Sequence, residues 1–339
     1  MVKRIKELDG IRAIAIAAVF LHHILHVKLL WMGVDLFFVL SGFLITGVLL
    51  DHKANSLKEY LGHFYRRRAQ RILPPYLLLL LVTTIVVGTI WIREWYYYFF
   101  LMNVITATGA PQPGSLSILW SLAVEEQFYL VWPFVVYFLS DAGIAWVAGG
   151  MAIAAPLLRW LCTPLFATHW AIYALTPFRM DTLAVGALLA LVWRRHPEKI
   201  RRFGQYGPLI SMCALGVLGI LAGNPEFRTR ANTHATNVLI YEMSLIICTG
   251  IIFWALSGRW VRVLTLAPVR YLGRVSYTVY LIHLTFYFVL TRYLHNTVWI
   301  NTLTLAGALL YAAVSWFVME KPILTAKPRP APLLEKTLA

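Results

Sequence analysis

The sequence is poor in charged residues, in cysteine and in long polar stretches. Only 13% of its 339 residues are charged, about half the share of roughly 25% in soluble domains. In contrast, 60% are hydrophobic and the mean hydropathy is +0.69. So little polar surface cannot coat a soluble core, which excludes a soluble enzyme, a disordered chain and a collagen-like fibre. The composition predicts an all-α polytopic membrane protein.

Several metal and nucleotide patterns are also missing. The three cysteines lie in or beside apolar segments at no metal-ligand spacing, which favours packing residues over a disulfide framework or a metal site. There is no Walker or Rossmann glycine pattern and no His-Glu-x-x-His motif, so nucleotide hydrolysis and zinc proteolysis lack support. We therefore expect no metal.

Ten apolar segments are candidates for crossing a bilayer, whose core of about 30 Å needs about 20 mostly apolar helical residues. They cover residues 11–30, 34–50, 74–91, 118–139, 143–161, 179–193, 206–223, 238–257, 275–294 and 300–319. The first is expected to be an uncleaved helix, because a second apolar run follows it at once and no small-residue cleavage site stands out. We expect a membrane domain over residues 1–323, a cytoplasmic tail over 324–339, and no appended soluble domain.

The basic residues indicate the orientation. The net charge of +15 would suggest a nucleic-acid partner in a soluble protein, but in a membrane protein Lys and Arg gather in cytoplasmic loops. With the N-terminus inside, the cytoplasmic segments hold 22 Lys and Arg and the outer segments hold 6. This bias predicts that both termini are cytoplasmic, with no nucleic-acid partner.

Arg12 and His23 stand out in the first apolar segment, because an ionisable side chain at a membrane helix centre costs about 2.5–3.5 kcal/mol or more. Their separation of eleven residues places them on one helix face, about 16 Å apart along the axis. His23 is then expected near mid-membrane, with Arg12 at the cytoplasmic edge. The alternative is that His23 only hydrogen-bonds a neighbouring helix.

The fourth segment carries two adjacent carboxylates, Glu125 and Glu126. Ser121, Glu125 and Tyr129 recur at intervals of four residues and form one polar stripe. Two adjacent carboxylates this far inside an apolar segment indicate a functional site, although an ion pair that locks helix packing is an alternative.

Three more ionisable residues begin segments at the outer side. Asp35 begins the second segment, and Arg179 and Asp181 begin the sixth. Asp181 could serve only to cap its helix and pair with Arg179.

Arg67, Arg68 and Arg71 lie just before Pro74 and Pro75 at the cytoplasmic interface. Arg68 and Arg71 share one helix face. Such guanidinium groups suit a phosphorylated ligand arriving from the cytosol. Positive-inside charge together with contact to lipid headgroups is the alternative.

Ordered blocks of the sequence resemble the acyltransferase 3 family of membrane-bound acyltransferases. The resemblance runs from about residue 6 to 323 and rests on residues 8–12, His23, 33–45, the paired-arginine block 64–74, and 120–130, with weaker similarity at 178–181, 276–277, His283 and 320–322. It implies about ten membrane helices and transfer of an acyl group, usually acetyl, from cytoplasmic acyl-CoA to a hydroxyl. The acceptor is commonly a sugar of a cell-surface or lipid-linked glycan. The location implied is a bacterial inner membrane.

The resemblance also implies roles for individual residues. His23 matches the family's essential histidine and would act as general base. Arg68 and Arg71 match its paired arginines and would hold CoA phosphates, with Arg12 helping and Arg67 as a further donor-binding candidate. A carboxylate should orient His23, and Glu125, Glu126 and Asp35 remain alternatives. Residues expected near the acceptor are Trp120, Ser121, Arg179 and Asp181.

Other functions and mechanisms remain open. The acyl group could first form a covalent intermediate on His23. A transporter or flippase for a polar metabolite would also place charges inside the membrane, although paired half-repeats are not evident. Relatives that acylate a small metabolite such as a macrolide give a further alternative, and a sensor or scaffold that keeps only the fold gives another. Acceptor choice is expected to depend on residues 92–117, 162–178 and 224–237.

Overall fold

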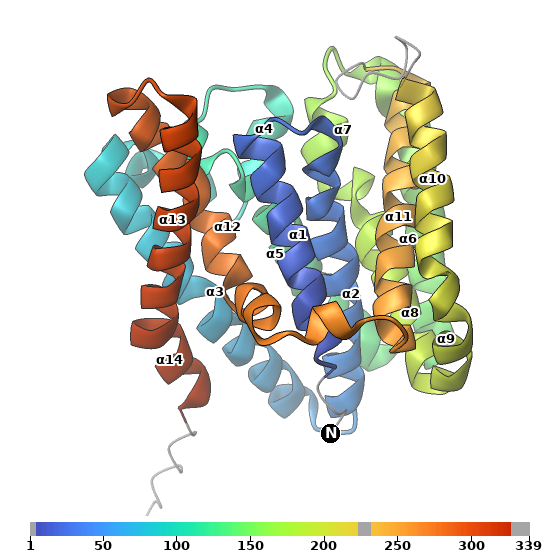
Figure 1. Ribbon diagram of the computed structural model, residues 1–339. Helices are drawn as coiled ribbons and strands as arrows, with labels where there is room; N and C mark the ends of the chain where they lie inside the picture. Colours follow the sequence, from blue (N-terminus) through green and yellow to red (C-terminus); the bar gives the residue numbers. More distant parts are fainter. Residues whose placement is uncertain (1–4, 223–231, 327–339) are drawn as a thin grey trace, which may run out of the picture.

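The computed structural model of the protein describes residues 5–222 and 232–326, which form a bundle of helices (Figure 1). No β-strand occurs in these two ranges, and the all-α prediction is confirmed. The longer helices are α1 (Glu7–Ile24), α2 (Gly33–His52), α3 (Leu57–Val87), α5 (Leu119–Phe138), α6 (Asp141–Cys162), α8 (Met180–Arg195), α10 (Gly207–Ala222), α11 (Tyr241–Ser257), α12 (Ala267–Tyr293) and α13 (Thr297–Ser315).

Short helices fill the ends of the bundle. They are α4 (Met102–Thr108), α7 (Trp170–Ala174), α9 (Pro197–Phe203) and α14 (Lys321–Thr325). Single π-helical turns precede α11 at Thr236–Ile240 and α14 at Trp316–Glu320. The expected tail, 324–339, and the outer segment 224–237 lie mostly outside the described residues.

The long helices cross the bundle alternately in the two directions. We call the end where α1 begins and α14 ends the lower end, and the end that carries α4 and α7 the upper end (Figure 1). The sides exposed between these ends are rich in large apolar side chains, including Ile85, Ile153 and Ile220, each more than 70% exposed. An apolar girdle of this kind suits contact with lipid.

Each of the ten predicted apolar segments overlaps one of the long helices. However, only six helical stretches of the described chain are both long and apolar enough to cross a membrane: Lys28–His52, Leu57–Val86, Asp141–Leu165, Pro197–Leu221, Thr236–Ser257 and Thr297–Thr325. The remaining four predicted segments fall on α1, α5, α8 and α12, which are shorter or more polar than these six stretches. These four helices hold most of the candidate site residues, so the count of ten spans stays a prediction.

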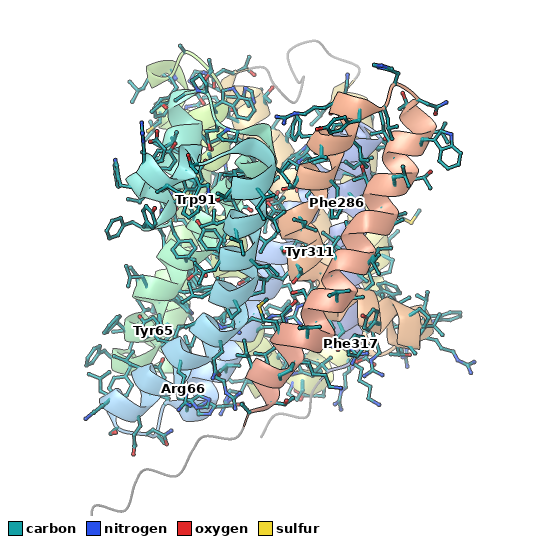
Figure 2. The ribbon with its side chains drawn as sticks, turned by 90° about the vertical axis from the view of Figure 1, so that its left-hand side faces the viewer. Tyr65, Arg66, Trp91, Phe286, Tyr311 and Phe317 are labelled. Atoms are coloured by element: carbon teal, nitrogen blue, oxygen red, sulfur yellow. The ribbon has the colours of Figure 1, made fainter. Side chains whose placement is uncertain are left out.

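Helix α3 differs most from its prediction. The apolar segment was predicted from residue 74, with Arg68 and Arg71 on a helix face just before it, and the helix in fact begins at Leu57, where Ser56 and Glu59 form a capping box. Pro74 and Pro75 therefore lie inside the helix. Figure 2 shows Tyr65 and Arg66 towards its lower end, with Trp91 beyond its upper end. The arginines of this segment are thus fixed on a regular helix.

Two parallel helix pairs form the centre. Helices α1 and α12 approach so closely that a Cβ at Gly273 would overlap the Asp9 carbonyl. Helices α2 and α8 cross in the same way, because a Cβ at Gly42 would overlap the Leu183 carbonyl. Small residues allow such close approach between membrane helices. The α1–α12 pair brings Arg12 and His23 beside side chains from the last quarter of the chain.

The outer helix α13 packs against α12. The rings of Phe286 on α12 and Tyr311 on α13 have centroids 6.3 Å apart, and Figure 2 shows both between the two helices. This contact covers the side of α12 that faces away from α1.

Candidate active site

His23 lies in the last turn of α1 and faces a second histidine. Helix α1 ends at Ile24, earlier than the predicted segment 11–30, so His23 lies at the upper end of its helix. Its Nδ1 lies 3.0 Å from Nε2 of His283 on α12, and the two ring centroids are 5.1 Å apart. His283 is fully buried, whereas His23 is partly exposed.

The hydrogen bonds assign the tautomers of this pair. Nδ1 of His283 lies 2.7 Å from the Tyr280 carbonyl, which can only accept, so this nitrogen carries the proton. In a neutral ring Nε2 of His283 is then an acceptor. His23 must therefore donate from Nδ1, which leaves its own Nε2 with a free lone pair. An imidazole held in this tautomer is arranged to accept a proton.

The expected carboxylate partner of His23 is thus replaced by His283. Asp35 accepts hydrogen bonds from Arg179 and Ser244, and Glu125 belongs to the cavity described next. The physical reason is the parallel packing of α1 on α12, which places a histidine beside His23.

A narrow cavity of about 270 Å³ runs inside the bundle beside α2. Val34 and Val48 both line it, and at 1.5 Å per residue they are about 21 Å apart along α2. The cavity is therefore long rather than round. Its polar wall consists of Arg12, Ser41, Arg68, Arg71, Ser121, Glu125, Tyr129, Ser276, Tyr277 and Tyr280.

Three guanidinium groups gather at one part of this wall. Arg12 pairs with Asp9 at 3.3 Å. Arg71 pairs with the buried Glu320 at 3.2 Å and also donates to the Arg274 carbonyl at 2.9 Å.

Arg68 differs from both. It lies over the Tyr129 ring at 5.7 Å and, in the described part of the chain, has no carboxylate within 4 Å. Arg67, a predicted donor-binding residue, does not line this cavity; it is exposed and donates to the Leu324 carbonyl at 3.2 Å. The cavity thus holds one cation whose charge no close carboxylate balances.

The carboxylates of α5 have different surroundings. Glu125 lines the cavity together with Ser41 and Tyr129, whose hydroxyls hydrogen-bond each other. Glu126 is not part of the lining, and its buried Oε1 has no hydrogen-bond partner in the described structure. The expected stripe of Ser121, Glu125 and Tyr129 therefore does line one cavity.

Two hydroxyls connect the cavity with the histidine pair. The Ser121 and Tyr280 hydroxyl oxygens are 2.5 Å apart, and both lie within 3.1 Å of the Ile118 carbonyl. The Tyr280 carbonyl in turn accepts from His283. One residue, Tyr280, thus separates the cavity from the pair.

A second group of charges is buried elsewhere in the bundle. Arg179 pairs with Asp35, and Arg159 pairs with Asp181 at 2.6 Å and with Glu242 at 2.5 Å. Both arginines are almost completely buried. The sequence suggested that Asp181 could pair with Arg179, but each has a different partner. Each guanidinium thus has a carboxylate partner inside the bundle, although Nε of both arginines has no hydrogen-bond partner in the described residues.

Trp120 belongs to the same group. The Arg179 guanidinium lies over its ring at 5.8 Å and over the Tyr241 ring at 4.7 Å. Trp120, Arg179 and Asp181 are absent from the lining of the narrow cavity, whereas Ser121 belongs to it. Of the four expected acceptor residues, the structure brings only Ser121 to the cavity.

Sequence reasoning missed several of these partners. Arg159 was only one of the six Lys and Arg counted for the outer side, although an arginine inside the apolar segment 143–161 is itself a signal of burial. Glu320 was noted only in a weak motif, yet it fixes Arg71 from 249 positions away. No local pattern indicates that contact.

The fold and the cavity define a multi-pass integral membrane protein with an internal polar chamber. The acyltransferase 3 family model, described as an acyltransferase domain, matches residues 5–320. The chain therefore belongs to this family, and the resemblance seen in its motifs is confirmed.

Named relatives are bacterial. The chain is 28% identical to the peptidoglycan O-acetyltransferase OatA of Listeria monocytogenes, over 95% of this chain and 56% of the relative. It is also 28% identical to the "Putative peptidoglycan O-acetyltransferase YrhL" of Bacillus subtilis, over 95% of this chain and 55% of the relative. The chain thus spans a little over half the length of these relatives. No solved structure matches it.

Proposed function

We propose that the protein is a membrane O-acyltransferase that moves an acyl group, acetyl in the simplest case, from acyl-CoA to a hydroxyl of a cell-surface or lipid-linked glycan. Family membership and the names of the relatives support this reaction and acceptor class. The observation that carries the proposal is the long cavity that begins among three arginines and ends one residue from a histidine pair.

The donor enters from the lower end of the bundle, which is the cytoplasmic side of a bacterial inner membrane. The surplus of Lys and Arg supports this orientation. Arg68, with Arg12 and Arg71 beside it, holds the diphosphate through charge-assisted hydrogen bonds. The pantetheine arm then extends along α2 and brings the thioester towards Ser121 and Tyr280.

His23 is the general base. Its Nε2 takes the proton of the acceptor hydroxyl while the oxygen attacks the thioester carbonyl carbon. The C–S bond then breaks, and the imidazolium returns the proton to the CoA sulfur, so an ester and free CoA result. His283 keeps His23 in the required tautomer, as a base-orienting group does in other acyl-transfer sites.

The carboxylates have supporting roles in this proposal. Glu125 lines the same cavity as Arg68, beyond ion-pair distance, and moderates the positive charge there without neutralising it. Asp35 acts indirectly, by fixing Arg179 and with it the packing around Trp120. Glu126, whose buried oxygen has no partner, is available to an acceptor hydroxyl.

Transfer of label from acetyl-labelled CoA tests the function. Purified protein is mixed with a membrane lipid and glycan extract, and His23→Ala is compared with the wild type. Label that enters glycan or lipid-linked glycan only with the wild type supports the proposal. Label in a small hydroxylated metabolite would change the acceptor class instead. Label that stays on the protein would favour the covalent route through His23.

A transporter is the competing function. It requires no turnover of the thioester, so a folded wild-type sample that neither binds CoA nor releases free thiol would contradict the transferase. Counterflow of a labelled polar metabolite in vesicles would then be the next measurement.

A further inference from the structure

A second and wider cavity, of about 1270 Å³, opens at the lower end of the bundle. The lower ends of α1, α2, α8, α9 and α11 surround it. Arg12, Leu44 and Val48 line both this cavity and the narrow one. The two spaces therefore adjoin at Arg12, where the proposed diphosphate contacts lie.

The wide cavity has the chemistry to hold a phosphorylated nucleoside. Trp193, at the end of α8, presents an indole to it, and the Arg201 guanidinium of α9 lies 5.7 Å from that ring centroid. Nucleobases of any kind stack on such rings, because every base has an aromatic face. Arginine held against an aromatic ring is also well placed to bind phosphate.

Four cations line the wide cavity, and two of them, Lys6 and Arg201, form no ion pair with a carboxylate in the described residues. Arg12 pairs with Asp9, and Arg194 pairs with Asp51 at 2.5 Å. Within residues 5–222 and 232–326, Arg201 has no carboxylate within 4 Å. Its charge is therefore available to an anionic ligand.

We propose that the wide cavity binds the 3′-phosphoadenosine end of acyl-CoA, with adenine against Trp193 and the 3′-phosphate against Arg201. This inference rests on the proposed function, because it divides one donor between two adjoining spaces. The diphosphate lies at the junction by Arg12, the pantetheine arm occupies the narrow cavity, and the nucleoside occupies the wide one. The nucleoside site is thus on a different set of helices from Arg68 and Arg71.

The test uses the full chain in lipid nanodiscs and two probes, CoA and adenosine 3′,5′-bisphosphate. The variants are Trp193→Ala and Arg201→Ala. The matched control is Arg202→Ala, whose guanidinium lies over the exposed Phe203 and does not line the cavity. Both test variants should weaken binding of both probes about tenfold, which corresponds to about 1.4 kcal/mol, and the control should bind both as the wild type does.

A donor without a nucleotide gives an independent readout. With S-acetylpantetheine the wide cavity stays empty, so the advantage of acetyl-CoA over this donor should fall about tenfold in Arg201→Ala and Trp193→Ala. A melting temperature measured for each variant shows whether Trp193→Ala still folds, and Arg201→Ala, at an exposed position, keeps the test valid if it does not.

The possible failures are distinguishable. If the wild type does not bind CoA, the proposed function fails. If it binds CoA but not adenosine 3′,5′-bisphosphate, or if Trp193→Ala and Arg201→Ala bind both probes normally, only the nucleoside site is refuted. If these variants lose affinity for short-chain phosphatidylglycerol and not for the nucleotide, the cavity holds a lipid headgroup and the inference is wrong.

Discussion

Replacing Arg68 by alanine should weaken CoA binding, whereas replacing its neighbour Arg67 should not. The two residues are adjacent arginines on helix α3 and carry the same charge. They differ in surroundings, because Arg68 lines the narrow cavity without a close carboxylate and Arg67 is exposed and bound to the Leu324 carbonyl. Comparing CoA binding by the two variants therefore separates a specific phosphate contact from the general effect of positive charge.

The size of the effect follows from the bond that is lost. Hydrogen bonds to charged groups contribute about 1.5–3 kcal/mol, and each 1.4 kcal/mol is a factor of about ten in affinity. Arg68→Ala should therefore raise the Kd for CoA about tenfold to a hundredfold. Arg67→Ala, at an exposed site, should change it by less than about twofold. Isothermal titration in nanodiscs measures both.

Two results would refute this reasoning. If both variants weakened CoA binding equally, the basic interface would act only by its overall charge. If Arg68→Ala bound CoA normally at an unchanged melting temperature, the narrow cavity would not be the donor path.

Three further predictions concern the supporting structure. His283→Leu should lower turnover about tenfold or more while leaving the Kd for CoA unchanged, because the catalytic imidazole loses the acceptor that fixes its tautomer; full activity would contradict the assignment. Asp35→Asn should cost about 3–5 kcal/mol of stability, since it leaves the charge of Arg179 buried without its partner, and thermal unfolding that matches the wild type would oppose this. Gly42→Val should destabilise the protein severely through overlap with the α8 backbone, whereas Gly47→Ala on the same helix, where a Cβ meets nothing within 4 Å, should be tolerated; equal melting temperatures would refute the close-packing argument.

The sequence predicts those features that follow from local periodicity and hydropathy. Apolar segments of membrane length coincide with helices because, away from water, a helix satisfies all its backbone hydrogen bonds within one segment. Ser121, Glu125 and Tyr129 line one cavity as their spacing indicated. The boundaries were less accurate, as at α3, where the capping box at Ser56 begins the helix at Leu57, well before the predicted apolar segment at residue 74.

Pairing between distant segments was not predictable in this way. His23 was expected to meet a carboxylate and meets His283, and Asp35 was a candidate for that role but pairs with Arg179. Both outcomes depend on which helices approach closely, and this is decided by small residues such as Gly273 at the crossing points. A contact across 260 positions leaves no periodic trace in the sequence.

The most direct test of the account measures turnover and CoA affinity together in His23→Ala. General-base catalysis contributes about 10²–10⁴-fold, so acetyl transfer should fall by at least about a hundredfold while the Kd for CoA stays within about twofold of the wild type. The combination would separate the histidine at one end of the cavity from the arginines at the other. Near-normal transfer by a correctly folded His23→Ala protein would contradict the central claim that this imidazole activates the acceptor.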